Sequence, residues 1–185
     1  MFIALRDLRF ARGRFALISA VIGLMTLMVV LLTGLTAGLS AASVSAVAAL
    51  PTTDIALAPP TAGQTLAFAT SSLPADTANR VAALPGVRTA HPLGISTTRL
   101  QSADTAAAAT VIGTDPALFP TLLSGSAPGA GQIAPTQTLA DDAHLQVGDT
   151  VTVAGRQVVV SGIVTDTSFS HLPVLYTDIG TWQQI

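Results

Sequence analysis

The sequence lacks three residue types that carry much of protein chemistry, since it contains no Cys, no Lys and no Glu. The absence of Cys excludes disulfides, thiolate catalysis and Cys-based zinc sites. It leaves the redox compartment open, because many exported bacterial domains also lack Cys. The absence of Lys excludes a P-loop, which needs that residue. All eight cationic residues are Arg and all ten acidic residues are Asp, which we interpret as the codon bias of a GC-rich genome.

Charged and aromatic residues are also scarce. They make up 10% and 4% of the chain, while half of the residues are hydrophobic. An average soluble domain carries about 25% charged residues. The net charge of -2 gives no support to nucleic-acid binding, which usually shows a basic patch. The length of 185 residues suffices for one ordinary domain and a membrane segment.

One long apolar run lies near the N-terminus. Residues 15–39 contain no charged side chain, and about 20 apolar residues span a hydrocarbon core of about 30 Å. In lipid this run must be helical, because nothing else there satisfies its backbone N–H and C=O groups. Four cationic residues precede it, and no other follows until Arg80: Arg6, Arg9, Arg12 and Arg14. Positive charge marks the cytoplasmic flank, so the sequence predicts a plasma-membrane protein with a cytoplasmic N-terminus and an extracytoplasmic main domain.

The alternative for this run is a cleaved signal peptide. The flank is basic, and residues 43–46 are small enough for a signal peptidase. However, the run is longer than the 7–15 apolar residues that are typical of signal peptides. Within residues 1–14, Phe2, Leu5 and Leu8 recur at helical spacing. This predicts an amphipathic segment on the inner membrane surface, with a plain basic flank as the alternative.

Two pairs of residues in the run are candidate contact sites. Gly34 and Gly38 form a GxxxG pair, which lets membrane helices approach closely, although small residues are common throughout this sequence. Met25 and Met28 lie about one helical turn apart. Packing is the default role of Met in such a helix, and the alternatives are substrate contact or thioether ligation of a metal or haem within the membrane.

The remaining chain predicts an α+β domain over residues 51–182, after an outward extension of the membrane helix to residue 50. We expect a strand at 54–58, a helix from Asp76 or Thr77 with Val81 and Leu84 on its apolar face, and a strand at 87–100 with a Pro-Gly break at 92–94. A turn at 102–109, a strand at 110–113, a helical turn after Pro116 and a loop at 124–131 follow. The last third predicts a helix at 138–144, a β-hairpin at 145–153 and 157–164, and a strand at 174–176.

No catalytic or cofactor-binding pattern is present. There is no G-x-S-x-G elbow. His91, His144 and His171 are far apart in sequence and lack metal-motif partners. His91 and His171 lie near a Pro in expected turns, so we interpret these two as surface residues and not as ligands. Asp141 and Asp142 are candidates for cation binding, but consecutive acids at a helix start usually act as caps and interact favourably with the helix dipole, and we favour that interpretation. The sequence therefore predicts no enzyme, no cofactor and no metal site.

Six stretches together resemble the permease subunits of MacB/FtsX-like ABC transporters. Their order and spacing carry the resemblance, which covers nearly the whole chain: residues 4–9, 14–17, 84–87, 112–116, 145–151 and 160–164. The resemblance implies a MacB-like periplasmic core domain behind the first membrane helix. It also implies a permease homodimer that pairs with a separate cytoplasmic ABC ATPase, with the first helix carrying motion to the outer domain.

The start of the chain is most similar to the DevC/HrtB-type permeases, some of which export haem. That resemblance implies efflux of a hydrophobic or amphiphilic substrate. The family's second to fourth membrane helices are missing here, and residues 183–185 stand where the second would begin, with Trp182 as an expected interfacial anchor. We therefore expect either the N-terminal part of a longer permease or a truncated gene product. The rivals are a single-span anchored binding or adaptor domain and a secreted domain cleaved after Ala46.

Overall fold

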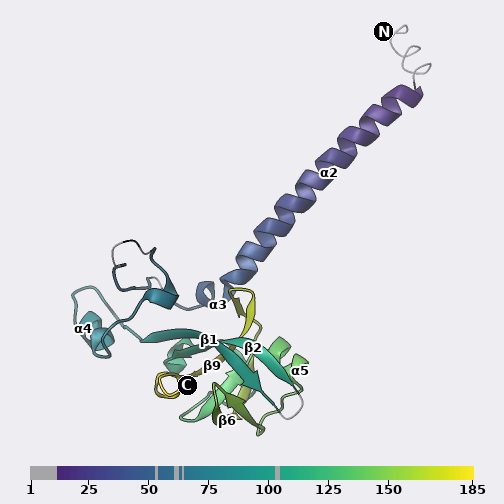
Figure 1. Cartoon of the computed structure of the whole chain (residues 1–185). Coiled ribbons are helices and arrows are strands. Elements are labelled where there is room, and N and C mark those ends of the chain that lie inside the picture. Colours follow the sequence, from purple (N-terminus) through teal and green to yellow (C-terminus); the bar gives the residue numbers. More distant parts are fainter. Residues whose placement is uncertain (1–11, 53, 61–62, 64, 103–104) are drawn as a thin grey trace. The chain divides into compact units, whose positions relative to one another are not determined.

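The computed structural model describes residues 12–52, 54–60, 63, 65–102 and 105–185. The chain divides into two compact units, Met1–Ala41 and Ala42–Ile185. We call the second unit the barrel domain. Figure 1 shows the elements of both units along the chain. The amphipathic segment expected at residues 1–14 lies, up to residue 11, outside the described residues.

The apolar run forms one long helix, α2 (Arg12–Ser43). Every described side chain from residue 13 to residue 41 is exposed. This stretch is long and apolar enough to cross a membrane, because 29 residues at about 1.5 Å each exceed a hydrocarbon core of about 30 Å. The hydroxyls of Thr26, Thr33 and Thr36 donate to carbonyls four residues earlier, which satisfies them within the helix itself.

The outward extension expected up to residue 50 is interrupted. α2 ends at Ser43, and Val44 leaves helical geometry with φ -121° and ψ 8°. A separate short helix, α3 (Ser45–Ala48), follows and ends before Pro51. Ala46 on α3 is only 1% exposed, so this helix belongs to the core of the barrel domain.

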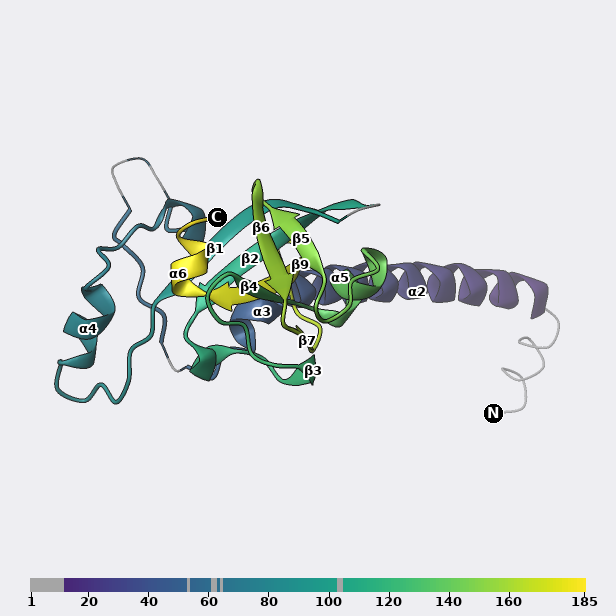
Figure 2. The same cartoon turned by 90° about the horizontal axis from the view of Figure 1, so that it is seen from below.

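The barrel domain is built on a sheet that closes on itself (Figure 2). Its strand order is β2-β1-β5-β6-β4-β9-β8, and β2 also pairs with β9. The strands are β1 (Leu93–Gln101), β2 (Ala106–Thr114), β4 (Gln132–Pro135), β5 (Thr150–Val153), β6 (Arg156–Val160), β8 (Ser168–Phe169) and β9 (Leu172–Asp178). The β2–β9 and β4–β6 pairings are parallel and the others antiparallel. Closure gives each of the six ring strands a partner on both sides, although β1 pairs with β5 only at Leu100 and Gln101.

Short elements complete the domain. They are a two-stranded sheet of β3 (Leu122–Gly125) and β7 (Gly162–Val164), the helices α4 (Thr77–Ala82), α5 (Gln137–Asp142) and α6 (Ile179–Trp182), and the 3-10 turns η1 (Phe68–Thr70) and η2 (Pro116–Leu118). The predicted class, one apolar helix followed by an α+β domain, is confirmed.

Both faces of the central strands are buried. On β2, Val111 belongs to one hydrophobic cluster and Ile112 to a second. On β9, Leu175 faces the first cluster, while Val174 and Tyr176 face the second. Successive side chains of a strand point to opposite faces, so burial on both sides requires a continuous apolar run and not an alternating one.

The described part of residues 51–93 contains no buried side chain. The strand predicted at residues 54–58 is wrong, since this stretch finds no pairing partner and runs into Pro59 and Pro60. Helix α4 forms as predicted, with Asp76 at the N-cap position but without a side-chain cap hydrogen bond. Its expected apolar face is not covered, because Leu84 is 55% exposed.

Three boundaries differ from the sequence-based expectations. The expected turn at 102–109 is strand from Ala106 onward, because β2 pairs with β1 from Leu93↔Thr114 to Gln101↔Ala106. The strand expected from residue 87 begins only at Leu93, after Pro92. The loop expected at 124–131 gives its first two residues to β3. Pairing partners distant in sequence decide these boundaries over local propensity.

The late elements follow the prediction closely. α5 covers residues 137–142, and β5 and β6 form the expected hairpin. The hairpin is shorter than expected, because residues 162–164 leave it as β7 and pair with β3. Ala154 and Gly155 connect them with φ values of 49° and 84°, as in the type I′ turns that suit the twist of two-residue hairpins. β9 contains the expected strand at 174–176.

The interpretation of Asp141 and Asp142 as acids at a helix start is wrong. They lie at the C-terminal end of α5, where the helix dipole disfavours negative charge. The N-terminus of this helix is capped instead by Asp166, whose carboxylate accepts from the Thr138 N–H at 2.8 Å. Asp141 accepts from the Gln137 side chain at 2.8 Å, which links the last turn of α5 to its first residue.

Candidate functional site

The predicted contact residues of α2 lie on different sides of the helix. Nothing lies within 4 Å of a Cβ placed at Gly34 or Gly38, so both glycines present open backbone. Met25 and Met28 are 65% and 63% exposed. Nine residues make about two and a half turns, so Met25 projects from the side opposite to Gly34. Packing through the glycines would leave Met25 uncovered.

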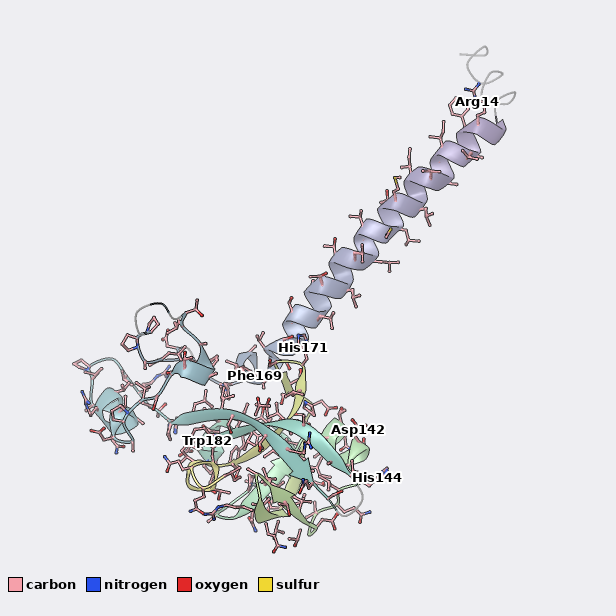
Figure 3. The ribbon with its side chains drawn as sticks, in the orientation of Figure 1. Arg14, Asp142, His144, Phe169, His171 and Trp182 are labelled. Atoms are coloured by element: carbon pink, nitrogen blue, oxygen red, sulfur yellow. The ribbon has the colours of Figure 1, made fainter. Side chains whose placement is uncertain are left out.

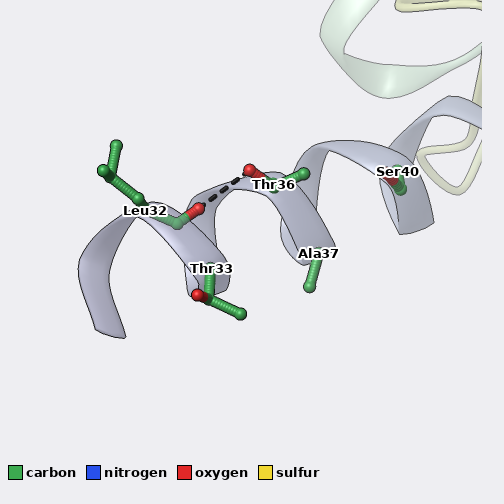
Figure 4. Close-up of a pocket in the computed structure, with 5 residues that line it drawn as sticks. All are labelled: Leu32, Thr33, Thr36, Ala37 and Ser40. Atoms are coloured by element: carbon green, nitrogen blue, oxygen red, sulfur yellow. Dashed lines mark hydrogen bonds between the residues drawn. The ribbon is translucent and has the colours of Figure 1, made fainter. Parts of the chain in front are cut away.

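A second surface of α2 carries small and hydroxyl side chains. Figure 4 shows a shallow hollow lined by Leu32, Thr33, Thr36, Ala37 and Ser40. The Thr36 hydroxyl donates to the Leu32 carbonyl at 2.8 Å, and Thr33 bonds back to Val29 in the same way. These hydroxyls can therefore lie in an apolar medium without an unsatisfied donor.

The last residues of α2 and the first of α3 are fixed to the turn between β8 and β9. We call Ser43, Ser45, Ser168, Ser170 and His171 the helix junction. The Ser170 N–H donates to the Ser43 carbonyl at 2.8 Å, and the Ser43 hydroxyl lies 3.0 Å from the His171 ring nitrogens. Ser45 accepts from the Ser168 N–H at 2.8 Å and donates to its carbonyl at 3.2 Å.

The β8–β9 turn takes a strained form to make these bonds. Ser170 and His171 have φ values of 52° and 64°. His171 is labelled in Figure 3. Left-handed backbone at non-glycine residues costs free energy and persists where surrounding contacts hold it. Here the Ser43 carbonyl and hydroxyl supply those contacts. In return, the Ser170 N–H bonds a carbonyl at the C-terminal end of α2, where a helix needs donors from outside itself.

A second cluster, the tryptophan junction, lies around α6. It consists of Gly94, Ser96, Gly113, Asp178, Thr181 and Trp182. A Cβ at Gly94 would lie 2.4 Å from the Trp182 ring, and one at Gly113 would lie 2.2 Å from the Trp182 Cβ. Only glycine therefore allows the indole to lie against β1 and β2. The indole N–H donates to Ser96 at 3.1 Å.

Hydrogen bonds of Asp178 and Thr181 also hold α6 in place. The Asp178 carboxylate accepts from the N–H groups of Gly180 and Thr181 at 2.9 and 3.2 Å and from the Thr181 hydroxyl. The Thr181 hydroxyl in turn accepts from the Gly131 N–H at 2.8 Å. Sequence reasoning placed Trp182 at a membrane interface, and the structure corrects this, because its apolar face and its N–H are both used within the barrel domain.

The three His side chains do not come together. His91 lies 3.5 Å from the Asp115 carboxylate, His171 belongs to the helix junction, and His144 is exposed near the end of α5 (Figure 3). Among the residues that the structure describes, no group of three His, Asp, Glu or Cys could hold a metal ion.

One buried titratable group stands out in the barrel domain. Burial raises the pKa of Tyr176 above its usual value of 10.0, while a hydrogen bond with Thr167 acts in the opposite direction. The two hydroxyl oxygens are 2.8 Å apart. The Tyr176 ring also packs edge-on against Phe119, with the ring centres 6.4 Å apart. We assign it a packing role in the second hydrophobic cluster.

Comparison with known proteins places this architecture in a family. The family model described as the MacB-like periplasmic core domain matches residues 15–185. Among solved structures, the chain is similar to the extracellular domain of the noncanonic ABC-type transporter YknZ from Gram-positive bacteria. That match has 13% identity and a TM-score of 0.53, and it covers 60% of this chain and 64% of the other.

The periplasmic region of MacB from Actinobacillus actinomycetemcomitans is also similar, with 18% identity and a TM-score of 0.50. That match covers 60% of this chain and 56% of the other, so the chain spans less than two thirds of both structures. No curated protein sequence matches the chain.

The fold defines a class, an α+β domain that follows one long apolar helix. The family match over residues 15–185 makes the assignment specific. The chain belongs to the family of MacB-like periplasmic core domains.

Proposed function

We propose that this chain forms the first membrane helix and the extracytoplasmic domain of an ABC transporter permease, with its N-terminus in the cytoplasm. One observation carries the proposal: an exposed apolar helix of 29 residues leads directly into a domain of the MacB-like family. The four Arg that precede the charge-free run at residues 15–39 support the orientation.

Topology can be tested cleanly, because the sequence contains no Cys. We would introduce Ser126→Cys in the barrel domain and, as the matched control, Ala11→Cys before α2. In intact cells, a membrane-impermeant maleimide should label the first variant and not the second. Two results would contradict the proposed orientation. One is that neither variant is labelled until the cells are lysed, and the other is that Ala11→Cys alone is labelled in intact cells.

The contacts around α3 support a retained helix over the secreted alternative. Cleavage after Ala46 would cut within α3, beside a side chain that is 1% exposed. It would also remove both serines of α2 and α3 that bind the β8–β9 turn. The mass of the mature protein purified from membranes should therefore include residues 1–46, and a product that begins at Val47 would refute retention.

The transport role itself is the further part of the proposal. We propose a permease homodimer, in contact with membrane lipid, that pairs with a cytoplasmic ABC ATPase and exports a hydrophobic or amphiphilic substrate, with haem as one candidate. The competing function is an anchored binding or adaptor domain without transport. Tagged protein isolated from native membranes should retain an ABC ATPase, and an adaptor would be recovered without one.

The surface of α2 supports specific contacts for this role. Gly34 and Gly38 offer open backbone for a second helix. Met25 and Met28 offer exposed thioethers to an apolar substrate that enters from lipid. Replacing both Met by Leu keeps the helix apolar, so a selective loss of export with normal membrane insertion would support substrate contact. Unchanged export would remove Met25 and Met28 as contact residues.

A further inference from the structure

One strand joins the two junctions directly. β9 begins at Leu172, immediately after the Ser170–His171 turn of the helix junction, and ends at Asp178, the N-cap of α6. No loop intervenes on either side. Whatever displaces one end of β9 therefore acts on a continuous extended backbone that reaches the other end.

The strand is held along its length. Val174, Leu175, Tyr176 and Thr177 are almost fully buried. β2 pairs with residues 174–178, β4 with 175–176 and β8 with 172–173. The Thr177 hydroxyl also donates to the Gln132 carbonyl at 2.7 Å. A close-packed strand of this kind cannot bend locally without disturbing both hydrophobic clusters.

The ends of the strand are also linked through side chains. Ala46 of α3 belongs to the same cluster as Val174 and Tyr176 of β9. At the other end, Gly113 is the register partner of Thr177 and the contact of Trp182. The helix junction and the tryptophan junction therefore contact β9 from its two ends and share no residue.

We propose that β9 is a rigid connector that couples the end of α2 to α6, so that loosening either junction loosens the other. The coupling depends only on contacts within the barrel domain, and it stands whether or not the chain serves in transport. Because coupling free energies are reciprocal, each junction must affect the other by the same factor.

Hydrogen exchange of the full chain in detergent micelles tests this coupling. Ser45→Ala removes the bonds with Ser168 at the helix junction. The amides of Gly180 and Thr181 at the far end of β9 should then exchange about fivefold faster, a factor that corresponds to the loss of about one hydrogen bond. His171→Gly, which relieves the turn strain and removes the Ser43 contact, is the second variant.

The matched control removes a comparable bond away from β9. Asp149 accepts from the Gln146 N–H at 2.8 Å near the start of β5, so Asp149→Ala should leave the Gly180 and Thr181 amides unchanged. In the reverse direction, Trp182→Phe, which removes the bond to Ser96, should speed exchange of the Ser168 and Ser170 amides.

Three results would overturn the connector. The first is faster exchange at Ser168 in Ser45→Ala with Gly180 and Thr181 at the wild-type rate. The second is uniform acceleration that includes Val151 and Val158 of the hairpin, which would indicate global destabilisation. The third is coupling in one direction only.

Discussion

The helix α2 and the barrel domain use apolar residues in opposite ways. In α2 the Leu, Val and Met side chains are exposed around the whole helix, and its described residues 13–41 include no buried one. In the barrel domain Val and Ile side chains fill two clusters on either face of shared strands. Apolar side chains are therefore used in two ways: α2 exposes them, as expected of a helix that crosses a membrane, whereas the barrel strands cover one another.

The largest effect is expected when a charged residue is placed in each of the two regions. Leu27→Asp in the middle of α2 should weaken membrane insertion by about 3–4 kcal/mol and leave the barrel domain folded. Ile112→Asp should cost the fold several kcal/mol, since it leaves an unpaired charge in a core where Ile112 is 0% exposed, and should leave insertion intact. Carbonate extraction reports insertion and protease resistance reports the fold.

This pair would fail if both substitutions produced the same phenotype. Unfolding of the barrel domain by Leu27→Asp would mean that α2 contributes to its core. Loss of membrane retention by Ile112→Asp would mean that the barrel domain, and not α2, holds the chain on the membrane.

The next effect concerns close packing, which the barrel domain requires and the exposed helix does not. Gly113→Ala places a Cβ 2.2 Å from the Trp182 Cβ, so it should lower the free energy of unfolding by about 1–3 kcal/mol. Gly129→Ala is the control, because its nearest neighbour is the Gln132 side-chain oxygen at 3.4 Å. Urea unfolding measures both variants.

The clash can be separated from a general glycine effect. In a Trp182→Gly background, Gly113→Ala should cost much less, because the Trp182 Cβ and the ring atoms beyond it are gone. Strict additivity of the two substitutions would show that Trp182 is not the reason for the glycine.

A smaller effect is expected on the helix surface. Gly34→Leu with Gly38→Leu should weaken self-association about tenfold, or ~1.4 kcal/mol. Thr36→Leu with Ser40→Leu is the control, since it places the same two Leu side chains at the same four-residue spacing on the other side of α2. Cross-linking in micelles compares the two, and equal loss in both pairs would argue against a glycine interface.

The smallest effect at neutral pH is the titration of Tyr176. Its pKa is raised by burial, so the folded state keeps the proton that the unfolded chain begins to lose near pH 10.0. Stability should be constant below that pH and fall as the pH rises through the folded-state pKa. The chain has one Tyr and neither Lys nor Cys, so Tyr176→Phe should abolish this fall in alkaline urea titrations. An unchanged fall in the variant would assign it to another group.

Sequence alone predicts the parts of this molecule that depend on local pattern. The charge-free run gives α2, and Ala154 with Gly155 gives the hairpin turn, because helix hydrophobicity and turn geometry need only neighbouring residues. The β1–β2 pairing was missed in part, since Ala106 to Ala109 have no strand preference and extend only because β1 pairs with them.

The junctions were missed for a related reason. Ser43 and Ser45 form hydrogen bonds with residues more than 120 positions later. A run of small residues does not indicate such a distant partner. We interpreted Trp182 as an interfacial membrane anchor because its position in the chain was the only available indication. Gly113 and Gly94, which contact the Trp182 side chain, are about 70 and 90 residues earlier in the chain. Only the pairing of β1 with β2 places these two glycines side by side.

The parallel pairing of β2 with β9 fixes when the barrel can close. The strand that completes the ring is the last one in the described order. During synthesis, β2 and β4 must wait for residues 172–178 before their free edges are paired. Until then the nascent chain exposes open strands to other chains. Premature termination within residues 150–171 should therefore yield aggregates, and chaperones at the site of emergence would be needed until β9 arrives.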